Sequence, residues 1–238
     1  TAEALSHMGH EFRNPIHIIN SLSELLLKNP LPNEVDEYAQ LIQISSKQLL
    51  SLVEDLVEIL KVISGRYNFK EENINLRDLI ALILDAQTDL TTKNKIHLQV
   101  QWHNSMLLDD NYLLISDPLR LQQALNIVTS FAIKISSPGN VYLNIKSAAG
   151  VNENNMQVIR FEIQDHATEI PVEKLNQIFM PFSSVELGLI QHHGGTGLSL
   201  ALCKVIVERM NGVVGAHHLL GKGNVFFIEI PFGVLKSL

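Results

Sequence analysis

The sequence predicts an α+β protein in which a helical hairpin precedes an α/β sandwich. Near the start of the chain, apolar residues recur at alternating steps of three and four, the spacing of a helix that packs in a bundle. From about Asn73 onward, short apolar strands alternate with amphipathic helices. The helical pattern ends at Ser64–Arg66. We therefore predict two domains, residues 1–68 and residues 69–238.

Each helix of the predicted hairpin has its own heptad seam. The first seam runs from Leu5 to Leu26. The second seam consists of Ile42, Leu49, Val53, Leu56, Leu60 and Ile63. Residues 28–33 between the seams contain two prolines and two asparagines, which end helices. One hairpin cannot cover both seams, so we expect a second copy of the chain to complete a dimeric four-helix bundle.

The second domain should contain strands and helices in alternation. The expected strands are Asn73–Leu76, Lys95–Gln101, Tyr112–Ser116, Val141–Ser147, Val158–Gln164, Val213–His218 and Val225–Ile230. The expected helices are Arg77–Leu90, Pro118–Ile135, Val172–Ile178 and Leu198–Met210. The stretch from Phe182 to Gly197 is crowded with glycine and histidine and has no periodicity, so we expect a mobile loop there.

Composition narrows the classes of function. Of the 238 residues, 46% are hydrophobic and 18% are charged, which is typical of a folded protein. The net charge is −7 and no basic run is present, so we expect no nucleic-acid partner. No apolar run is long enough to span a bilayer, so this segment should make no membrane contact. Cys203 is the only cysteine, which excludes an internal disulfide and favours a cytoplasmic location.

His10 is the first candidate for chemistry. On a helical projection it lies nearly opposite the seam of the first helix, so its imidazole should face away from the bundle. The neighbouring Glu11 carboxylate could accept a hydrogen bond from Nδ1, which would leave Nε2 as the nucleophile. Asn14 follows one turn later. We expect the three side chains to form one surface patch.

The strings around these residues and further along the chain resemble the landmarks of sensor histidine kinases. His10–Pro15, which reads His-Glu-Phe-Arg-Asn-Pro, resembles the H-box, and Asp117–Gln123 resembles the entry to the N-box helix. Phe179–Phe182 resembles the F-box, and Gly195–Leu200 resembles the second glycine box. This resemblance implies a dimerisation and phosphotransfer hairpin followed by a nucleotide-binding domain of the Bergerat type, whose mixed sheet has helices on one face.

The resemblance also implies a reaction. In an active family member, Mg-ATP bound to the second domain donates its γ-phosphoryl group to the histidine, here His10, with Glu11 as the base. The phosphohistidine then passes the group to an aspartate of a response-regulator receiver domain. Asn14 would orient the water that hydrolyses the regulator's phosphoaspartate. The implied partners are a second copy of the chain and a receiver domain. The segment would be cytoplasmic, alone or as part of a larger, membrane-associated sensor.

The N-box departs from the family pattern. The family presents two asparagines one turn apart on this helix, the second of which binds magnesium. In a gapless alignment these positions are Ile127 and Phe131, which offer no oxygen to a hard cation. A shift by one residue places Asn126 and Ser130 there, but Lys134 then falls out of step with the motif. In either register the usual magnesium amide is missing.

Both glycine boxes are altered as well. The first, Asp165–Ile170, keeps only its aspartate and isoleucine. Asp165 could still bind an adenine amino group. However, the Cβ of Ala167 narrows the space for the nucleotide, and Glu169 adds negative charge near a triphosphate. The second box has Ser199 in place of a third glycine. The Cys/His spacing of a zinc site is missing, so we predict no metal held by protein residues. The candidate nucleotide-binding residues are Asn126, Ser130, Lys134, Asp165, Gly195, Thr196 and Gly197.

Three hypotheses for function remain open. In the first, the chain is the transmitter core of a sensor kinase whose His10 relays phosphate, while binding of Mg-ATP is weak or lost. In the second, it is a fully active, divergent ATP-dependent histidine autokinase. In the third, it is a non-enzymatic dimeric module that binds and regulates another sensor kinase. The first hypothesis leads, because the phosphoacceptor string is intact whereas the nucleotide motifs are altered.

Overall fold

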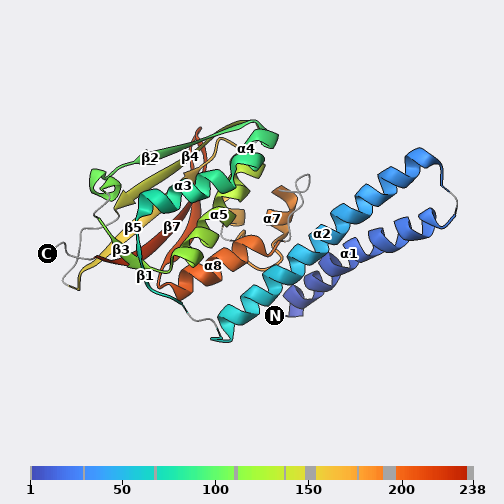
Figure 1. Cartoon of the computed structure of the whole chain (residues 1–238), viewed down its shortest axis with the longest axis horizontal. Coiled ribbons are helices and arrows are strands. Elements are labelled where there is room, and N and C mark those ends of the chain that lie inside the picture. Colours follow the sequence, from blue (N-terminus) through green and yellow to red (C-terminus); the bar gives the residue numbers. More distant parts are fainter. Residues whose placement is uncertain are drawn as a thin grey trace.

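The chain forms a long helical hairpin joined to an α/β domain (Figure 1). The computed structural model describes residues 2–28, 30–66, 69–109, 112–136, 138–147, 154–175, 177–189 and 197–234. Within these residues, no helix is both long enough and apolar enough to cross a membrane. The boundary between residues 68 and 69 stays a prediction, because residues 67–68 lie outside the described part.

The hairpin consists of α1 (Ala2–Leu26) and α2 (Pro32–Ile63), which confirms the two predicted helices. Pro32 opens α2 at a position where the missing backbone N–H is not needed by the helix. The Glu34 carboxylate accepts a hydrogen bond from the Leu31 N–H at 2.7 Å and so satisfies a donor at the helix start. The proline-containing turn therefore both ends α1 and begins α2.

The apolar residues of α2 divide into two stripes, where the sequence predicted one seam. Ser45, Leu52 and Ile59 are buried at a spacing of seven residues. Val53 and Leu60, which belong to the predicted seam, are 42% and 56% exposed. Adjacent residues on a helix point about 100° apart, so Leu52 and Ile59 face a different direction from Val53 and Leu60. Burial of the predicted seam by a second copy of the chain stays a prediction. We call the exposed row the outer stripe; it consists of Leu50, Val53, Val57 and Leu60.

The second domain contains one mixed sheet, and all seven predicted strands are present. They are β1 (Glu72–Ile74), β2 (Ile96–Trp102), β3 (Leu114–Ser116), β4 (Gly139–Ser147), β5 (Met156–Gln164), β6 (Val213–Leu219) and β7 (Gly223–Val234). The order is β1-β3-β7-β5-β4-β2, and β6 also pairs with β7. The β2–β4 pair is parallel and the other pairs are antiparallel.

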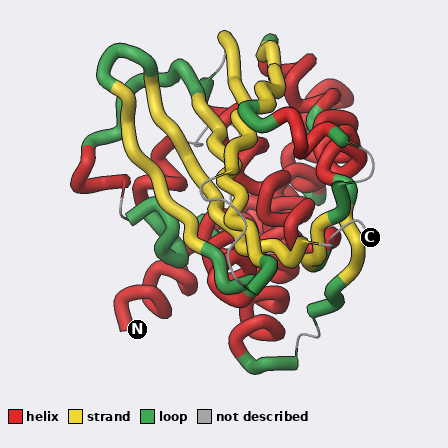
Figure 2. Tube along the Cα trace, turned by 90° about the vertical axis from the view of Figure 1, so that its left-hand side faces the viewer, coloured by secondary structure: helices red, strands yellow, loops and turns green. Residues whose placement is uncertain are grey.

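Helices cover one face of this sheet (Figures 1 and 2). They are α3 (Leu76–Ala86), α4 (Thr88–Asn94), α5 (Pro118–Ile135), α6 (Val172–Leu175), α7 (Ser184–Leu189) and α8 (Ser199–Arg209), with a 3-10 turn at Ser105–Leu108. The core lies between the sheet and α5, where Leu121 and Leu125 meet fully buried strand residues such as Phe161 and Phe226. The predicted α/β architecture is confirmed.

Two local predictions were wrong. The helix expected at Arg77–Leu90 is divided at Gln87, whose backbone ends α3 and whose buried side chain bonds to α5. The loop expected at Phe182–Gly197 contains α7. Val185 and Leu189, one helical turn apart, pack against the core and so give this short helix an apolar face. The sequence analysis missed this spacing because the stretch is rich in glycine, which favours loops.

Candidate functional site

The predicted phosphoacceptor patch lies on α1. His10 and Asn14 are exposed, and Glu11 is half-buried between them. Phe12 on another side of the helix packs against the hydrophobic core, which fixes the direction in which the patch faces. The structure therefore places the imidazole of His10 on an open surface, with a carboxylate next to it and an amide one turn further on. A protein partner could reach these groups directly.

Three of the predicted nucleotide-binding residues come together in one cavity. Asn126, Ser130 and Lys134 lie on one side of α5 and line a cavity of about 230 Å³. Gln87 already forms hydrogen bonds with two of them. Its amide nitrogen donates to Asn126 Oδ1 at 3.1 Å, and its amide oxygen accepts from Ser130 Oγ at 2.9 Å. These oxygens serve to hold α5 against the α3–α4 junction.

Aromatic and aliphatic side chains stand where a magnesium ligand would be in the gapless alignment. Phe131 is buried and meets Phe226 edge-to-face, with ring centroids 5.3 Å apart. Ile127 lines the cavity beside it. Among the described residues, no group of three or more His, Cys, Asp or Glu side chains could hold a metal ion. Neither Phe131 nor Ile127 offers the oxygen ligand that magnesium prefers.

Asp165, the candidate for adenine recognition, is sealed inside the domain. Its exposed fraction is 0%. Its Oδ1 accepts hydrogen bonds from the Asn224 backbone N–H at 2.8 Å, the Asn224 amide at 3.0 Å and the Ala167 N–H at 3.0 Å. Burial raises the pKa of the Asp165 carboxyl, although the Asn224 and Ala167 bonds oppose the shift. All three of these donors belong to the chain itself.

The rest of the first glycine box is bonded to the β6–β7 hairpin. Asn224 Oδ1 accepts from the Ile170 N–H at 2.8 Å, and the Asn224 amide donates to the Thr168 carbonyl at 3.2 Å. Glu169 Oε1 accepts from the Gly221 N–H at 2.7 Å. Gly223 permits this approach, since a Cβ there would lie 2.3 Å from the Asp165 carbonyl oxygen. Sequence reasoning missed the role of Asn224 altogether.

Sequence reasoning also missed a buried carboxyl group. It belongs to Glu186, which lines the same cavity as Asn126, Ser130 and Lys134. Glu186 of α7 is 1% exposed, and neither of its oxygens has a hydrogen-bond partner in the described part of the chain. Burial raises its pKa to about 8, with a further contribution from the negative charge of Asp55. Lys134 opposes this shift, and its own pKa is lowered by burial.

The second glycine box is described only in part. Gly195 and Thr196 lie outside the described residues. Gly197 is buried with φ +66°, a conformation that favours glycine, and its carbonyl accepts from the Phe182 N–H at 2.7 Å. Ser199, at the start of α8, donates to Asp55 Oδ2 on α2 at 3.4 Å. The hairpin therefore reaches the rim of the cavity.

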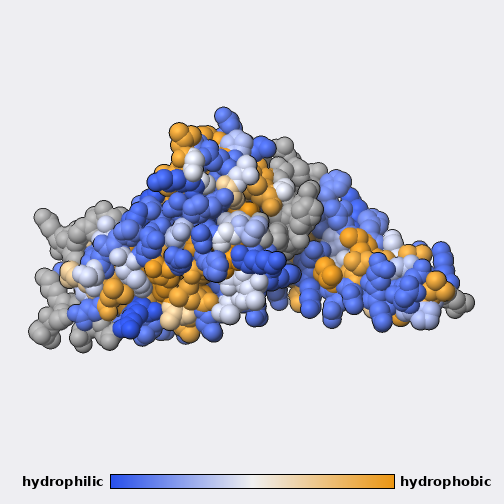
Figure 3. Space-filling model, turned by 90° about the horizontal axis from the view of Figure 1, so that it is seen from above, coloured by the Kyte–Doolittle hydropathy of each residue, from blue (hydrophilic) through white to orange (hydrophobic). Residues whose placement is uncertain are grey.

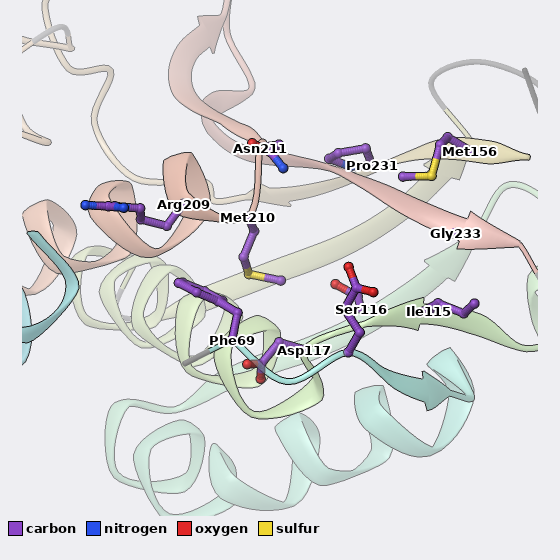
Figure 4. Close-up of a pocket in the computed structure, with 11 residues that line it drawn as sticks. Phe69, Ile115, Ser116, Asp117, Met156, Arg209, Met210, Asn211, Pro231 and Gly233 are labelled. Carbon is purple, nitrogen blue, oxygen red and sulfur yellow. The ribbon is translucent and has the colours of Figure 1, made fainter. Parts of the chain in front are cut away.

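A second cavity, of about 340 Å³, lies at the junction between the hairpin and the sheet (Figure 4). Phe69 and Met210 lie on one side of it and Met156 and Pro231 on the other. Its polar groups support the chain itself. The Asp117 carboxylate accepts from the Lys70 and Arg120 N–H groups, and Arg209, also at the cavity, donates to the Ile63 carbonyl. We assign it a structural role.

Comparison with known proteins identifies both parts of the chain. Residues 2–65 match the His Kinase A (phospho-acceptor) domain family. Residues 116–234 match the family of histidine kinase-, DNA gyrase B- and HSP90-like ATPases. The sensory/regulatory protein RpfC of Xanthomonas campestris is 29% identical over 98% of this chain. The chain spans about a third, 32%, of that relative's length.

Solved structures share the fold. Full-length ShkA in complex with AMPPNP matches with a TM-score of 0.69 and 22% identity, over 100% of this chain and 47% of that one. Histidine kinase ThkA in complex with the response regulator protein TrrA matches with a TM-score of 0.68 and 23% identity, over 96% of this chain and 61% of that one. The arrangement of hairpin and α/β domain is thus one that these proteins have in common.

Proposed function

Because the chain belongs to the family of two-component sensor histidine kinases, we propose that it is a transmitter core in which His10 carries a phosphoryl group to a response-regulator aspartate, while nucleotide binding by the second domain is weak or lost. The patch of exposed His10 and Asn14 with half-buried Glu11 is the observation that supports the carrier role. The sealed carboxylate of Asp165 supports the loss of nucleotide binding.

The patch provides what reversible phosphotransfer between proteins requires. His10 Nε2 attacks the phosphorus of a receiver's aspartyl phosphate, the P–O bond to the carboxylate breaks, and the carboxylate leaves. Glu11 accepts a hydrogen bond from Nδ1–H and stabilises the positive charge that develops on the ring. In the opposite direction the phosphohistidine passes the group to the receiver. Asn14 orients the water that hydrolyses the aspartyl phosphate in the phosphatase direction.

We propose two protein partners. The outer stripe leaves four large apolar side chains exposed at heptad spacing on α2, and Figure 3 shows apolar groups on the surface of the hairpin. A second copy of the chain would bury this stripe and complete a four-helix bundle. The receiver domain of a response regulator is the second partner. ThkA, which shares this fold, was solved in complex with the regulator TrrA.

One observation favours the alternative of an active, divergent autokinase. Asn126, Ser130 and Lys134 do line a single cavity next to the second glycine box. Release of Gln87 from Asn126 and Ser130 would free two oxygen ligands there. The two readings differ in one measurable property, which is whether the purified chain takes phosphate directly from ATP.

Radiolabelling tests the proposal. We expect [γ-³²P]ATP alone to leave the wild-type chain unlabelled, and a ³²P-labelled receiver domain to label the wild type but not His10→Gln. His17→Gln, an exposed histidine two turns along α1, is the matched control and should be labelled like the wild type. Label on His10→Gln would refute the carrier role. Rapid labelling of the wild type by ATP alone would establish the autokinase instead.

A further inference from the structure

The start of α8 is suited to an anion. This helix spans 11 residues and begins at Ser199, within the second glycine box, with Leu198 at its cap position. The first N–H groups of a helix point outward along its axis and carry a partial positive charge. Leu198 has no polar side chain with which to neutralise that charge. Phosphate groups commonly bind at such a helix start.

A cation on a neighbouring helix completes this environment. Lys134 of α5 lines the same cavity as Ser199, the first residue of α8. Lys134 is half-buried, and burial lowers its pKa. A buried ammonium group is stabilised by a nearby negative charge, because attraction between charges is stronger where water is excluded. Lys134 and the α8 start thus attract a negative charge in the cavity, although for Glu186 burial outweighs this attraction and raises the pKa to about 8.

The chain places a carboxyl group of its own in this position. Glu186 of α7 lines the cavity with Lys134 and Ser199 and is 1% exposed. The Leu200 N–H, at the start of α8, points toward the carboxylate and favours its ionised form, but lies outside hydrogen-bonding geometry. Both carboxylate oxygens are without a hydrogen-bond partner among the described residues. A buried acceptor held without partners is costly to keep there.

We propose that Glu186 is a built-in competitor for a phosphate group of a nucleoside triphosphate at the start of α8. A phosphate could bind there only after α7 moves and withdraws the carboxyl group. This inference rests on the proposed function, since it explains weak nucleotide binding by a second cause besides the sealed Asp165. Glu186 then determines how well the second domain binds nucleotide.

The charges around Glu186 set the direction of its pH dependence. Lys134 on α5 attracts the ionised carboxylate, whereas Asp55 on α2 repels it. Cys203 on α8 also faces Glu186, and Lys93 on α4 acts on Lys134. As pH rises, Glu186 loses its proton and becomes the anion that competes with phosphate. Nucleotide affinity should therefore fall as pH rises through the titration of this group.

Calorimetric titration with Mg-AMPPNP tests the competitor role. We expect Glu186→Ala to bind about tenfold more tightly than the wild type at about pH 9, where Glu186 is ionised, and with nearly the same affinity at about pH 7. Glu208→Ala, at the exposed far end of α8, is the control and should bind like the wild type. Equal or weaker binding by a folded Glu186→Ala at the higher pH would overturn the inference. Tight binding by the wild type itself would instead refute the proposed loss of nucleotide binding.

A second variant keeps the test decisive if the alanine variant fails to fold. Glu186→Gln fills the same volume but cannot ionise. Wild-type affinity should fall about fivefold between about pH 7 and pH 9, and the fall should vanish in Glu186→Gln. An equal fall in both proteins would overturn the inference, because the pH dependence would then belong to another group.

Discussion

The two candidate sites of this chain treat their polar groups in opposite ways. Around His10 the polar side chains are exposed or half-buried. Around Asp165 the polar side chain is fully buried and bonded to Asn224. Polar groups at a surface site form hydrogen bonds with water when no partner is bound, so their exposure does not destabilise the fold. A buried site must be satisfied by its ligand or by the chain.

The comparison explains why the sequence changes at the nucleotide site go together. Glu169, which we predict in place of a family glycine, accepts a hydrogen bond from the Gly221 N–H. Phe131, which we predict in place of an amide, packs against Phe226. Each replacement is satisfied within the domain. Within the described residues, no hydrogen bond from the side chains of His10, Glu11 or Asn14 is present, so we expect the patch to depend on partners that lie outside this chain.

We expect the largest effect on the dimer dissociation constant, from a substitution in the outer stripe of α2. Val53→Glu places a charge in the outer stripe, and burying a carboxylate in an apolar interface costs several kcal/mol. We expect the dimer dissociation constant to rise by about two orders of magnitude or more, as measured by analytical ultracentrifugation. Leu82→Glu, an exposed leucine on α3, should leave dimerisation unchanged. A stable Val53→Glu dimer would contradict the assignment of the outer stripe.

A smaller effect tests the sealed site. Asn224→Ala removes the side-chain amide that bonds Asp165 and the side-chain oxygen that accepts from Ile170. Because buried groups then lose their partners, we expect the free energy of unfolding to fall by about 2–3 kcal/mol in urea titrations. Gln99→Ala, exposed on β2, is the control and should change it by less than about 0.5 kcal/mol. Unchanged stability in Asn224→Ala would mean that the site is not satisfied from within.

Local signals in the sequence predicted most of the fold. Asp117 and Pro118 marked the start of α5, and the structure begins the helix there, with the Asp117 carboxylate accepting the Arg120 N–H at 3.0 Å. The outward direction of His10 followed from helical spacing in the same way. Asn224 could not be found by such means, because its partner Asp165 lies 59 residues earlier.

Glu186 was missed for a related reason. A short helix within a glycine-rich stretch gives too few residues for periodicity to be recognised, so α7 was read as loop. Its carboxyl group gains significance only through Lys134 and the start of α8, which lie elsewhere in the sequence. Sequence patterns report neighbours along a helix or strand, whereas the chemistry of this cavity depends on residues that tertiary packing brings together.

The smallest expected effect concerns the contact between the two regions. Glu58 on α2 forms an ion pair of 3.0 Å with Arg120 on α5, and the two side chains are 23% and 16% exposed. Because the pair is partly solvated, we expect Glu58→Gln to cost only about 0.5–1 kcal/mol of stability, and less at high salt. Glu54→Gln, exposed one turn earlier on α2, should cost nothing measurable.

Differential scanning calorimetry of both variants at low and high salt checks this expectation. A small loss of stability that is confined to Glu58→Gln and reduced by salt would show that charge contributes only modestly to docking of the hairpin on the second domain. Burial of apolar residues such as Leu52 and Ile59 would then contribute more to the stability of this contact. A loss of several kcal/mol would show that the two regions are locked together by charge. In that case the patch around His10 and the buried site around Asp165 could not behave as independent sites.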